Sequence, residues 1–297
     1  MTAAPPPDIA RRQRVATLVT GALETAGLGI SPPDLDDALR AAELDGARIV
    51  EQELIAHEDA AAARTRTKAC FAQRIAGPSL HRIAGLGAWQ ARALAGEAAM
   101  RAGAIFNLGI VLFDAALDSG GPEARAEALA FDLAALSYPA ATPEFAFFQT
   151  VARRFFVLAG PAADHQALAR LLAAERASVT MPGNARVLRA KSVGPFLVMA
   201  SLGRGDAAVA RAFGRAVWIV DDLWDWDEDG AAQTGRPWLR GGDEEDVLAA
   251  EARCLATALG STRGWPQEAC AALSATLAAW VRMPVPQPLF AALPMRD

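Results

Sequence analysis

The stretches Ala216-Val-Trp-Ile-Val-Asp-Asp-Leu-Trp-Asp225 and Ala104-Ile-Phe-Asn-Leu-Gly-Ile-Val-Leu-Phe-Asp-Ala-Ala-Leu-Asp118 carry the strongest structural signal in this 297-residue chain. In each stretch an apolar run leads into aspartates spaced four residues apart. Residues i and i+4 lie one above the other on a helix, with Cβ atoms about 5–6 Å apart. Each stretch therefore predicts a largely buried helix that presents two carboxylates in the same direction.

These acids define two motifs: Asp114 and Asp118 form the first acidic motif, and Asp221, Asp222 and Asp225 form the second acidic motif. Buried carboxylates need partners or a metal ion. Because the ligands are all oxygens, without accompanying histidine or cysteine, the pattern favours Mg²⁺. An aspartate on a helix usually meets only water, so a solvated role is the alternative for either motif alone. We predict that all five aspartates are metal ligands.

A third element precedes the second acidic motif. The segment Arg189-Ala-Lys-Ser192 places two cations and a hydroxyl at the start of an apolar run, and Lys191 lies 30 residues before Asp221. A lysine is a compact positive charge that suits phosphate oxygens. The segment therefore predicts an anion-binding residue near the beginning of a buried helix.

The stretch from Lys191 to Asp225 resembles the C-terminal half of the trans-polyprenyl diphosphate synthases and the wider class I isoprenoid synthase superfamily. Residues 112–118 are similar to the first Asp-Asp-x-x-Asp motif of that family, with Ala115 in place of the second aspartate. The resemblance spans roughly residues 100–230. It implies an all-α fold, namely an antiparallel helical bundle with a central apolar cavity. It also implies three Mg²⁺ ions and an allylic diphosphate as the small-molecule substrate.

The same resemblance assigns individual residues. It implies that Lys191, Arg189 and Arg236 bind the diphosphate, with Arg236 in the segment that closes over it after the second acidic motif. For Arg236, a surface loop that balances its own charges is the alternative. We further expect Phe113 and Asn107 to line the cavity beside the first acidic motif.

Two further features point toward a cyclising enzyme. Trp218 stands where the family usually has glutamine, one helical turn before the second acidic motif. Its ring can stabilise a carbocation by cation–π attraction of about 2 kcal/mol when desolvated, although core packing is an equal alternative. Gly194-Pro195 removes a backbone hydrogen bond and predicts a helix break like that of cyclising members of the superfamily. An ordinary proline kink is the alternative.

Two basic segments of the chain-elongating relatives are missing. Those enzymes share a Gly-Gly-Lys-x-x-Arg segment before the first motif and an Arg-Arg-Gly segment after it. The two segments hold isopentenyl diphosphate. Neither occurs here, and Arg74, Arg82 and Arg125 lack the required spacing. A diphosphate without cations to bind it stays in water. The absence of these segments favours intramolecular reactions of one substrate.

We therefore expect a terpene synthase or cyclase that ionises an allylic isoprenyl diphosphate with Mg²⁺ and releases diphosphate. Two alternatives stay open. One is a prenyltransferase, which elongates a chain or uses a non-isoprenoid acceptor, and the other is a catalytically idle subunit that binds an active partner. The retained aspartates and Lys191 argue against idleness, because a mere binding subunit has no need to bury them.

Composition indicates a helical protein. Hydrophobic residues make up 53% of the chain, alanine and leucine dominate, and the β-branched and aromatic runs that mark strands are scarce. Helix starts are predicted at Ser31, Gly121 and Thr142, each followed by proline and then an acidic residue. Because no long polar linker interrupts the helical pattern, we expect a flexible tail over residues 1–8 and one domain over residues 9–297.

Charge and cysteine usage limit the partners and the location. The net charge of −5 and the isoelectric point of about 5.4 disfavour nucleic acid as a partner. No apolar run spanning a bilayer and no signal peptide is evident, so we expect a cytoplasmic protein that does not cross a membrane. Cys70, Cys254 and Cys270 show neither disulfide nor zinc spacing and are interpreted as reduced core residues. A homodimer is compatible with these features.

Overall fold

The computed structural model describes residues 9–55, 78–118, 121–133, 136, 140–226 and 243–282. Within these ranges the chain forms helices and turns, and no strand occurs. The all-α class predicted from composition is confirmed. The predicted tail over residues 1–8, and Arg236 among the predicted site residues, lie outside the described residues.

The long helices are α1 (Ile9–Thr25), α2 (Pro32–Val50), α4 (Pro78–Ala95), α5 (Met100–Asp118), α6 (Pro122–Ala130), α7 (Pro143–Ala159), α8 (His165–Thr180), α9 (Ala185–Ser201), α10 (Ala207–Trp224), α12 (Glu244–Gly260) and α13 (Gln267–Trp280). Short helical turns accompany them: η1 (Glu51–Ile55) continues α2, η3 (Glu97–Ala99) precedes α5, and η5 (Gly160–Ala162) follows α7.

Local sequence explains where several helices begin. Helices α2, α6 and α7 start at the prolines that follow Ser31, Gly121 and Thr142, so the three predicted starts are confirmed. The Ser31 side chain accepts a hydrogen bond from the backbone N–H of Asp34, and Thr142 accepts one from Phe145. Each side chain satisfies a donor that the first turn of a helix leaves without an intrahelical partner.

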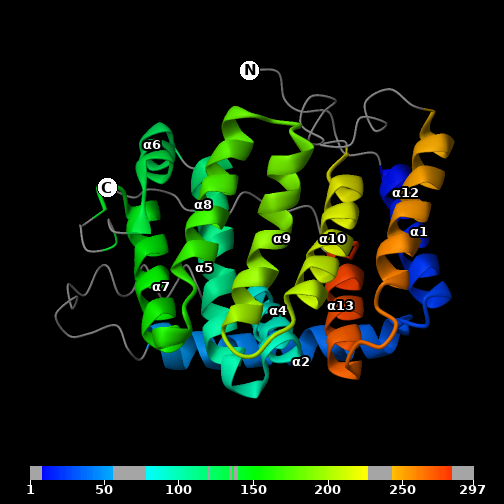
Figure 1. The fold of residues 1–297 in the computed structure, drawn as a ribbon, viewed down its shortest axis with the longest axis horizontal. Coiled ribbons are helices and arrows are strands. Elements are labelled where there is room, and N and C mark those ends of the chain that lie inside the picture. Colours follow the sequence, from blue (N-terminus) through cyan, green and yellow to red (C-terminus); the bar gives the residue numbers. More distant parts are fainter. Residues whose placement is uncertain are drawn as a thin grey trace.

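Most long helices stand side by side, with α7 and α5 toward one side of the bundle and α12 and α1 at the other (Figure 1). Helix α9 packs against α8 on one flank and α10 on the other. Short turns join these three consecutive helices, so they alternate in direction. Helix α2 crosses the lower ends of the upright helices and packs along α4.

Glycines allow α2 and α4 to approach closely. A Cβ atom added to Gly46 would lie 1.8 Å from the carbonyl oxygen of His81. One added to Gly85 would lie 1.7 Å from the carbonyl oxygen of Ala42. Both contacts are with backbone atoms, which cannot turn aside as a flexible side chain can. The close packing of the two helices therefore requires glycine at both positions.

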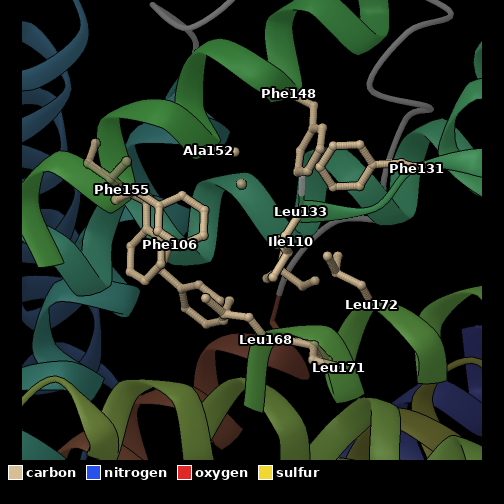
Figure 2. Close-up of a pocket in the computed structure, with 13 residues that line it drawn as sticks. Phe106, Ile110, Phe131, Leu133, Phe148, Ala152, Phe155, Leu168, Leu171 and Leu172 are labelled. Carbon is tan, nitrogen blue, oxygen red and sulfur yellow. The ribbon is translucent and has the colours of Figure 1, made fainter. Parts of the chain in front are cut away.

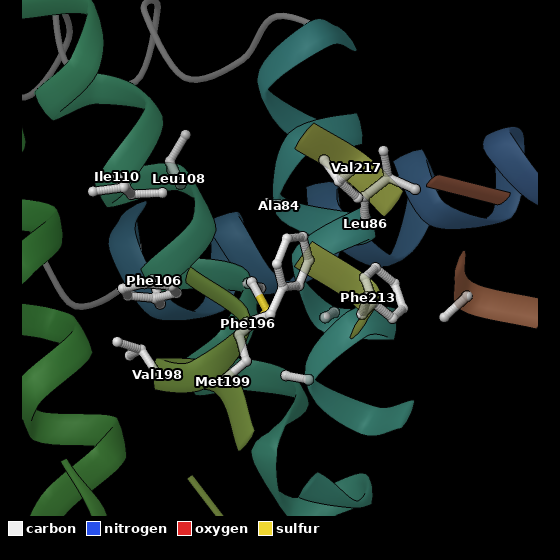
Figure 3. Close-up of a cluster of buried hydrophobic side chains, with 14 of the residues drawn as sticks. Ala84, Leu86, Phe106, Leu108, Ile110, Phe196, Val198, Met199, Phe213 and Val217 are labelled. Carbon is white, nitrogen blue, oxygen red and sulfur yellow. The ribbon is translucent and has the colours of Figure 1, made fainter. Parts of the chain in front are cut away.

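Buried apolar side chains from all the long helices form the core. Figure 3 shows one part of it, where Phe196 of α9 and Phe213 of α10 pack with ring centroids 4.7 Å apart. Burial of such a side chain stabilises the fold by about 1.5–3 kcal/mol. Cys254 and Cys270 are free and half-buried, and Cys254 packs against the core. Cys70 lies outside the described residues.

The expectation that the chain does not cross a membrane is supported by the burial of the most apolar helical stretch among the described residues. Among the described residues one helical stretch, Glu97–Asp118, has the length and apolar character of a membrane span. However, 67% of its most apolar part is buried inside the protein. Leu108, Leu112 and Phe113 of α5 are each at most 1% exposed. Helix α5 is thus a core helix of the bundle, which explains its composition.

The predicted break at Gly194-Pro195 does not interrupt its helix. Helix α9 runs continuously from Ala185 to Ser201 with Pro195 in its interior. Proline removes only the hydrogen bond to the carbonyl of Lys191, four residues back. Gly194 instead serves packing, because a Cβ atom there would lie 2.7 Å from Cδ1 of Leu171 on α8. Contacts with the neighbouring helix hold α9 together through the proline.

Candidate functional site

Three charged side chains from three helices meet in the bundle. The Nζ atom of Lys191 on α9 lies 2.5 Å from Oδ1 of Asp114 on α5 and 3.3 Å from Oε2 of Glu175 on α8. The Glu175 side chain is 3% exposed, that of Lys191 27% and that of Asp114 38%. The lysine therefore bridges a buried carboxylate on one side and a partly exposed carboxylate on the other.

Burial and charge shift the pKa values of this group in a consistent way. Burial raises the pKa of the Glu175 carboxyl well above its usual 4.5, while the adjacent Lys191 charge opposes that shift. Burial disfavours the charged form of Lys191, but the negative charges of Asp114 and Glu175 outweigh it and raise its pKa well above 10.5. Lys191 is therefore a cation at every physiological pH.

The first acidic motif behaves as two interacting charges. Burial raises the pKa of Asp118, and the negative charge of Asp114 raises it further, whereas Lys191 and Arg125 lower it. The two carboxylates of the motif thus repel each other, as their spacing along one helix face predicts. A cation shared between them would relieve this repulsion.

The second acidic motif lies at the same end of the bundle as the first. A Cβ atom added to Gly214 of α10 would lie 2.7 Å from Cα of Val193 on α9. Because the two helices are antiparallel, α10 beyond Gly214 runs back toward the start of α9. Asp221, seven residues farther on, lies about 10 Å along the helix axis, near the level of the first turn of α9. Lys191, in the second turn of α9, contacts Asp114.

Members of the second acidic motif differ in exposure. Asp222 is buried, whereas Asp221 and Asp225, the residue that follows α10, are half-buried. Within the described residues, no three acidic, histidine or cysteine side chains gather closely enough to enclose one ion. The donors nevertheless fit Mg²⁺, which commonly binds one or two carboxylates and completes its shell with water and phosphate oxygens.

An apolar pocket lies one helical turn below the charged group. Its free volume is about 40 Å³, and its walls are almost wholly apolar (Figure 2). Ile110 of the lining lies four residues before Asp114, and Leu171 lies four residues before Glu175. Residues four apart share a helix face. The remaining lining residues come from α5, α7, α8 and the segment after α6: Ile105, Phe106, Gly109, Phe131, Leu133, Phe148, Ala152, Phe155, Phe156, Leu168 and Leu172.

Two residues predicted to line a cavity have other roles. Phe113 is fully buried among phenylalanines, with its ring centroid 5.1 Å from that of Phe148, and it is not part of the pocket lining. Asn107 donates a hydrogen bond of 2.8 Å to the carbonyl oxygen of Ile83 and so ties α5 to α4. Neither residue lines this pocket, although Asn107, seven residues before Asp114, shares the helix face of Asp114. A role of the two residues in a larger cavity stays a prediction.

The basic residues predicted to bind the diphosphate are not all brought together. Lys191 lies at the candidate site, whereas Arg189 is exposed on α9. The two residues are two positions apart in the sequence, which turns Arg189 by about 200° around the helix relative to Lys191. Trp218 is half-buried on α10, one turn before Asp221 and on the same helix.

Glu175 was not predicted as a site residue, although the sequence contains a pattern that indicates it. It follows Leu168, Leu171 and Leu172 at intervals of seven, four and three residues, so it shares their buried helix face. An acid on an apolar face is costly to bury without a partner. That pattern predicts a paired carboxylate, and the partner, Lys191, could not be read from the spacing.

Comparisons with protein-family models, curated proteins and solved structures find no match for the chain. The likeness to isoprenoid synthases therefore rests on the residues of the two acidic motifs and the lysine segment. The described part of the chain is all-helical, and both acidic motifs lie at one end of the bundle. Lys191 lies beside the first acidic motif, and an apolar pocket lies below that motif.

Proposed function

We propose that the protein catalyses Mg²⁺-dependent ionisation of an allylic isoprenyl diphosphate, acting as a terpene synthase that releases diphosphate. One observation carries the proposal. Lys191 and both acidic motifs gather at one end of an all-helical bundle, directly above an apolar pocket. A substrate with a charged head and a long hydrocarbon tail matches this division between charged and apolar surfaces.

Asp114 and Asp118 on α5, and Asp221 and Asp225 on α10, are the residues that would hold the metal ions. Bound Mg²⁺ would neutralise the negative charge that grows on the departing diphosphate. Lys191 adds a fixed positive charge at the same place, where partial burial strengthens its interaction with phosphate oxygens. In the structure this lysine is paired with Asp114. Ligand binding must therefore exchange partners within the site.

The hydrocarbon part of the substrate suits the apolar pocket. Its free volume of about 40 Å³ is smaller than the range of about 300–1,000 Å³ that is common for small-molecule sites, so a hydrocarbon tail would enter only if the lining side chains move apart. Phe106, Phe148 and Phe155 contribute aromatic surface to the walls. Aromatic faces attract cations, which is the charge that the hydrocarbon acquires when diphosphate leaves.

The proposal is tested by incubating the purified protein with Mg²⁺ and each of the C10, C15 and C20 allylic diphosphates. Half of the reactions also contain isopentenyl diphosphate, and the organic products and the released pyrophosphate are measured. We expect pyrophosphate release together with cyclic or acyclic terpenes from one allylic substrate alone. Efficient formation of longer diphosphates only with isopentenyl diphosphate would identify a prenyltransferase instead. No turnover of any substrate would overturn the proposal.

A further inference from the structure

Glu175 contacts Lys191 but has no part in the proposed reaction. Its carboxylate is 3% exposed and lies 3.3 Å from Nζ of Lys191. The same Nζ atom lies 2.5 Å from Asp114, which is exposed to a much greater degree. Lys191 thus has an inner partner that solvent hardly reaches and an outer partner at the mouth of the site.

The two partners of the lysine have different tasks. If Asp114 binds a divalent cation, its carboxylate oxygens are no longer fully available to Lys191. An ammonium group has three donors on a flexible four-carbon chain, so a lysine that loses its only anchor can swing into water. A second anchor that faces away from the substrate would keep the ammonium in place during this exchange.

Lysine is rare in this chain, so its use at position 191 instead of arginine is notable. Lys68 and Lys191 are its two lysines among 29 basic residues. An arginine at position 191 would offer a planar fork with five donors, a poor match to two carboxylates on opposite sides of one point. The arrangement of Asp114 and Glu175 suits a compact charge that both can share.

We propose that Glu175 is a positioning residue that anchors Lys191 while Asp114 exchanges the lysine for a divalent cation. Glu175 does not touch the substrate in this scheme and acts through Lys191. The inference rests on the proposed function, since it assigns the ligand of Lys191 to the diphosphate class. It also makes a claim that holds without ligand, namely that Glu175 immobilises the Lys191 ammonium group.

The variants Glu175→Ala and Glu175→Gln test the inference in the full-length protein. The matched control is Glu53→Gln, because Glu53 is also fully buried and paired with cations, Arg101 and Arg154, but lies away from the site. Selective ¹⁵N labelling of lysine gives signals from two side chains, and a Lys191→Met variant identifies the one of interest. Hydrogen exchange at that Nζ atom reports its anchoring without any ligand.

Binding of inorganic pyrophosphate in the presence of Mg²⁺ is then measured by calorimetry. We expect Glu175→Ala to speed exchange at Lys191 and to weaken pyrophosphate binding roughly tenfold or more, the effect of one charged hydrogen bond. Glu175→Gln, which keeps an acceptor of the same shape, should fall between Glu175→Ala and the native protein. Glu53→Gln should lower thermal stability and leave both readouts unchanged.

The possible outcomes separate the two proposals. Unchanged exchange at Lys191 in Glu175→Ala would overturn the positioning role, and so would faster exchange with unchanged pyrophosphate affinity. Faster exchange in a protein whose native form binds no pyrophosphate would retain the anchoring of Lys191 and overturn the proposed function. If Glu175→Ala does not fold, Glu175→Gln supplies the same comparisons with smaller expected changes.

Discussion

The guanidinium carbon of Arg12 lies 4.9 Å from the centroid of the Trp224 ring, which directly precedes the last aspartate of the second acidic motif. The neighbouring Arg11 lies 4.7 Å from the centroid of Trp226. Helix α1 therefore covers the end of α10 with two cation–π contacts. Because Arg12 is only 8% exposed, its contact falls near the upper end of the usual range, about 2 kcal/mol.

Replacement of Arg12 should loosen the end of α10. We expect Arg12→Met to lower the free energy of unfolding by about 2 kcal/mol and to raise the Mg²⁺ concentration needed for half-maximal pyrophosphate release. Arg12→Lys should recover part of both losses. Arg14→Met is the control, since Arg14 is half exposed and its ion pair with Glu244 contributes at most about 1 kcal/mol. Equal effects of Arg12→Met and Arg14→Met in urea unfolding would contradict the prediction.

The pH dependence of the free energy of unfolding should reflect the titration of the Glu175 carboxyl. Its folded-state pKa is raised above 4.5 by burial, so the folded protein binds this proton more tightly than the unfolded chain does. The free energy of unfolding therefore falls as the pH rises from 4.5 to the raised folded-state value. Glu175→Gln removes that decline and should gain stability relative to the native protein over this interval. Lys191→Met should extend the decline to higher pH, because the lysine charge lowers the pKa of Glu175.

Urea unfolding at a series of pH values checks this expectation. Lys191 itself adds a second change only at high pH. Its raised pKa means that its stabilising charge is fully present below 10.5 and is lost as the pH rises through the folded-state value. Parallel stability curves for the native protein and Glu175→Gln above pH 4.5 would show that Glu175 has an ordinary pKa.

Asp114→Asn and Asp221→Asn should abolish most turnover. Loss of a ligand to a metal ion that neutralises developing charge costs several kcal/mol, or roughly a thousandfold in rate. Pyrophosphate release is followed at increasing Mg²⁺, with EDTA as the metal-free reference. Asp36→Asn serves as the control, because Asp36 is an exposed residue paired with Arg282. Full activity of the native protein in EDTA would refute a role for the metal.

Trp218→Leu should change the products rather than the ionisation step. If the indole faces the reacting hydrocarbon, its removal takes away cation–π stabilisation, so early-quenched acyclic alcohols or alkenes should replace cyclic products. Gas chromatography with mass spectrometry measures the ratio. Trp265→Leu is the matched control, since Trp265 packs against Phe213 in the core. An unaltered product ratio with lower thermal stability would mean that Trp218 only fills the core, at a cavity cost of a few kcal/mol.

Gly46→Ala and Gly85→Ala should each destabilise the bundle. The added methyl group would meet backbone oxygens less than 2 Å away, and overpacking of this kind typically costs about 1–3 kcal/mol. Gly21→Ala in α1 is the control, because nothing lies within 4 Å of the added atom. That change should stabilise by about 0.4–1 kcal/mol, since alanine favours the helix. Thermal unfolding of the three variants would contradict the prediction if all moved in the same direction.

Local chemistry accounts for what was predictable in the fold. The cap residues Ser31 and Thr142 mark true helix starts because their side chains bond backbone groups only a few residues away. The acidic motifs were predictable for the same reason, since the helical repeat places residues four apart on one face. The all-α class follows from these local preferences summed along the chain.

The predicted helix break was wrong because it considered only the backbone hydrogen bond that proline removes. Pro195 does remove a backbone bond, but packing of α9 against α8 and α10 holds the helix continuous through it. The apolar character of α5, in contrast, correctly predicted a largely buried helix. Its composition would suit a lipid environment, and only the helices around it turn that surface into protein core.

Sequence alone determined which residues share a helix face, because that depends on a fixed rotation of about 100° per residue. It could not determine which neighbour each face meets. Asp114 and Lys191 are 77 positions apart, and their contact exists because α5, α8 and α9 pack together. The partner of Glu175, and the contacts of Phe113 with Phe148 and of Asn107 with Ile83, follow from the same packing. The tertiary structure decided these contacts, since the free energy of burying a helix face depends on the surface that covers it.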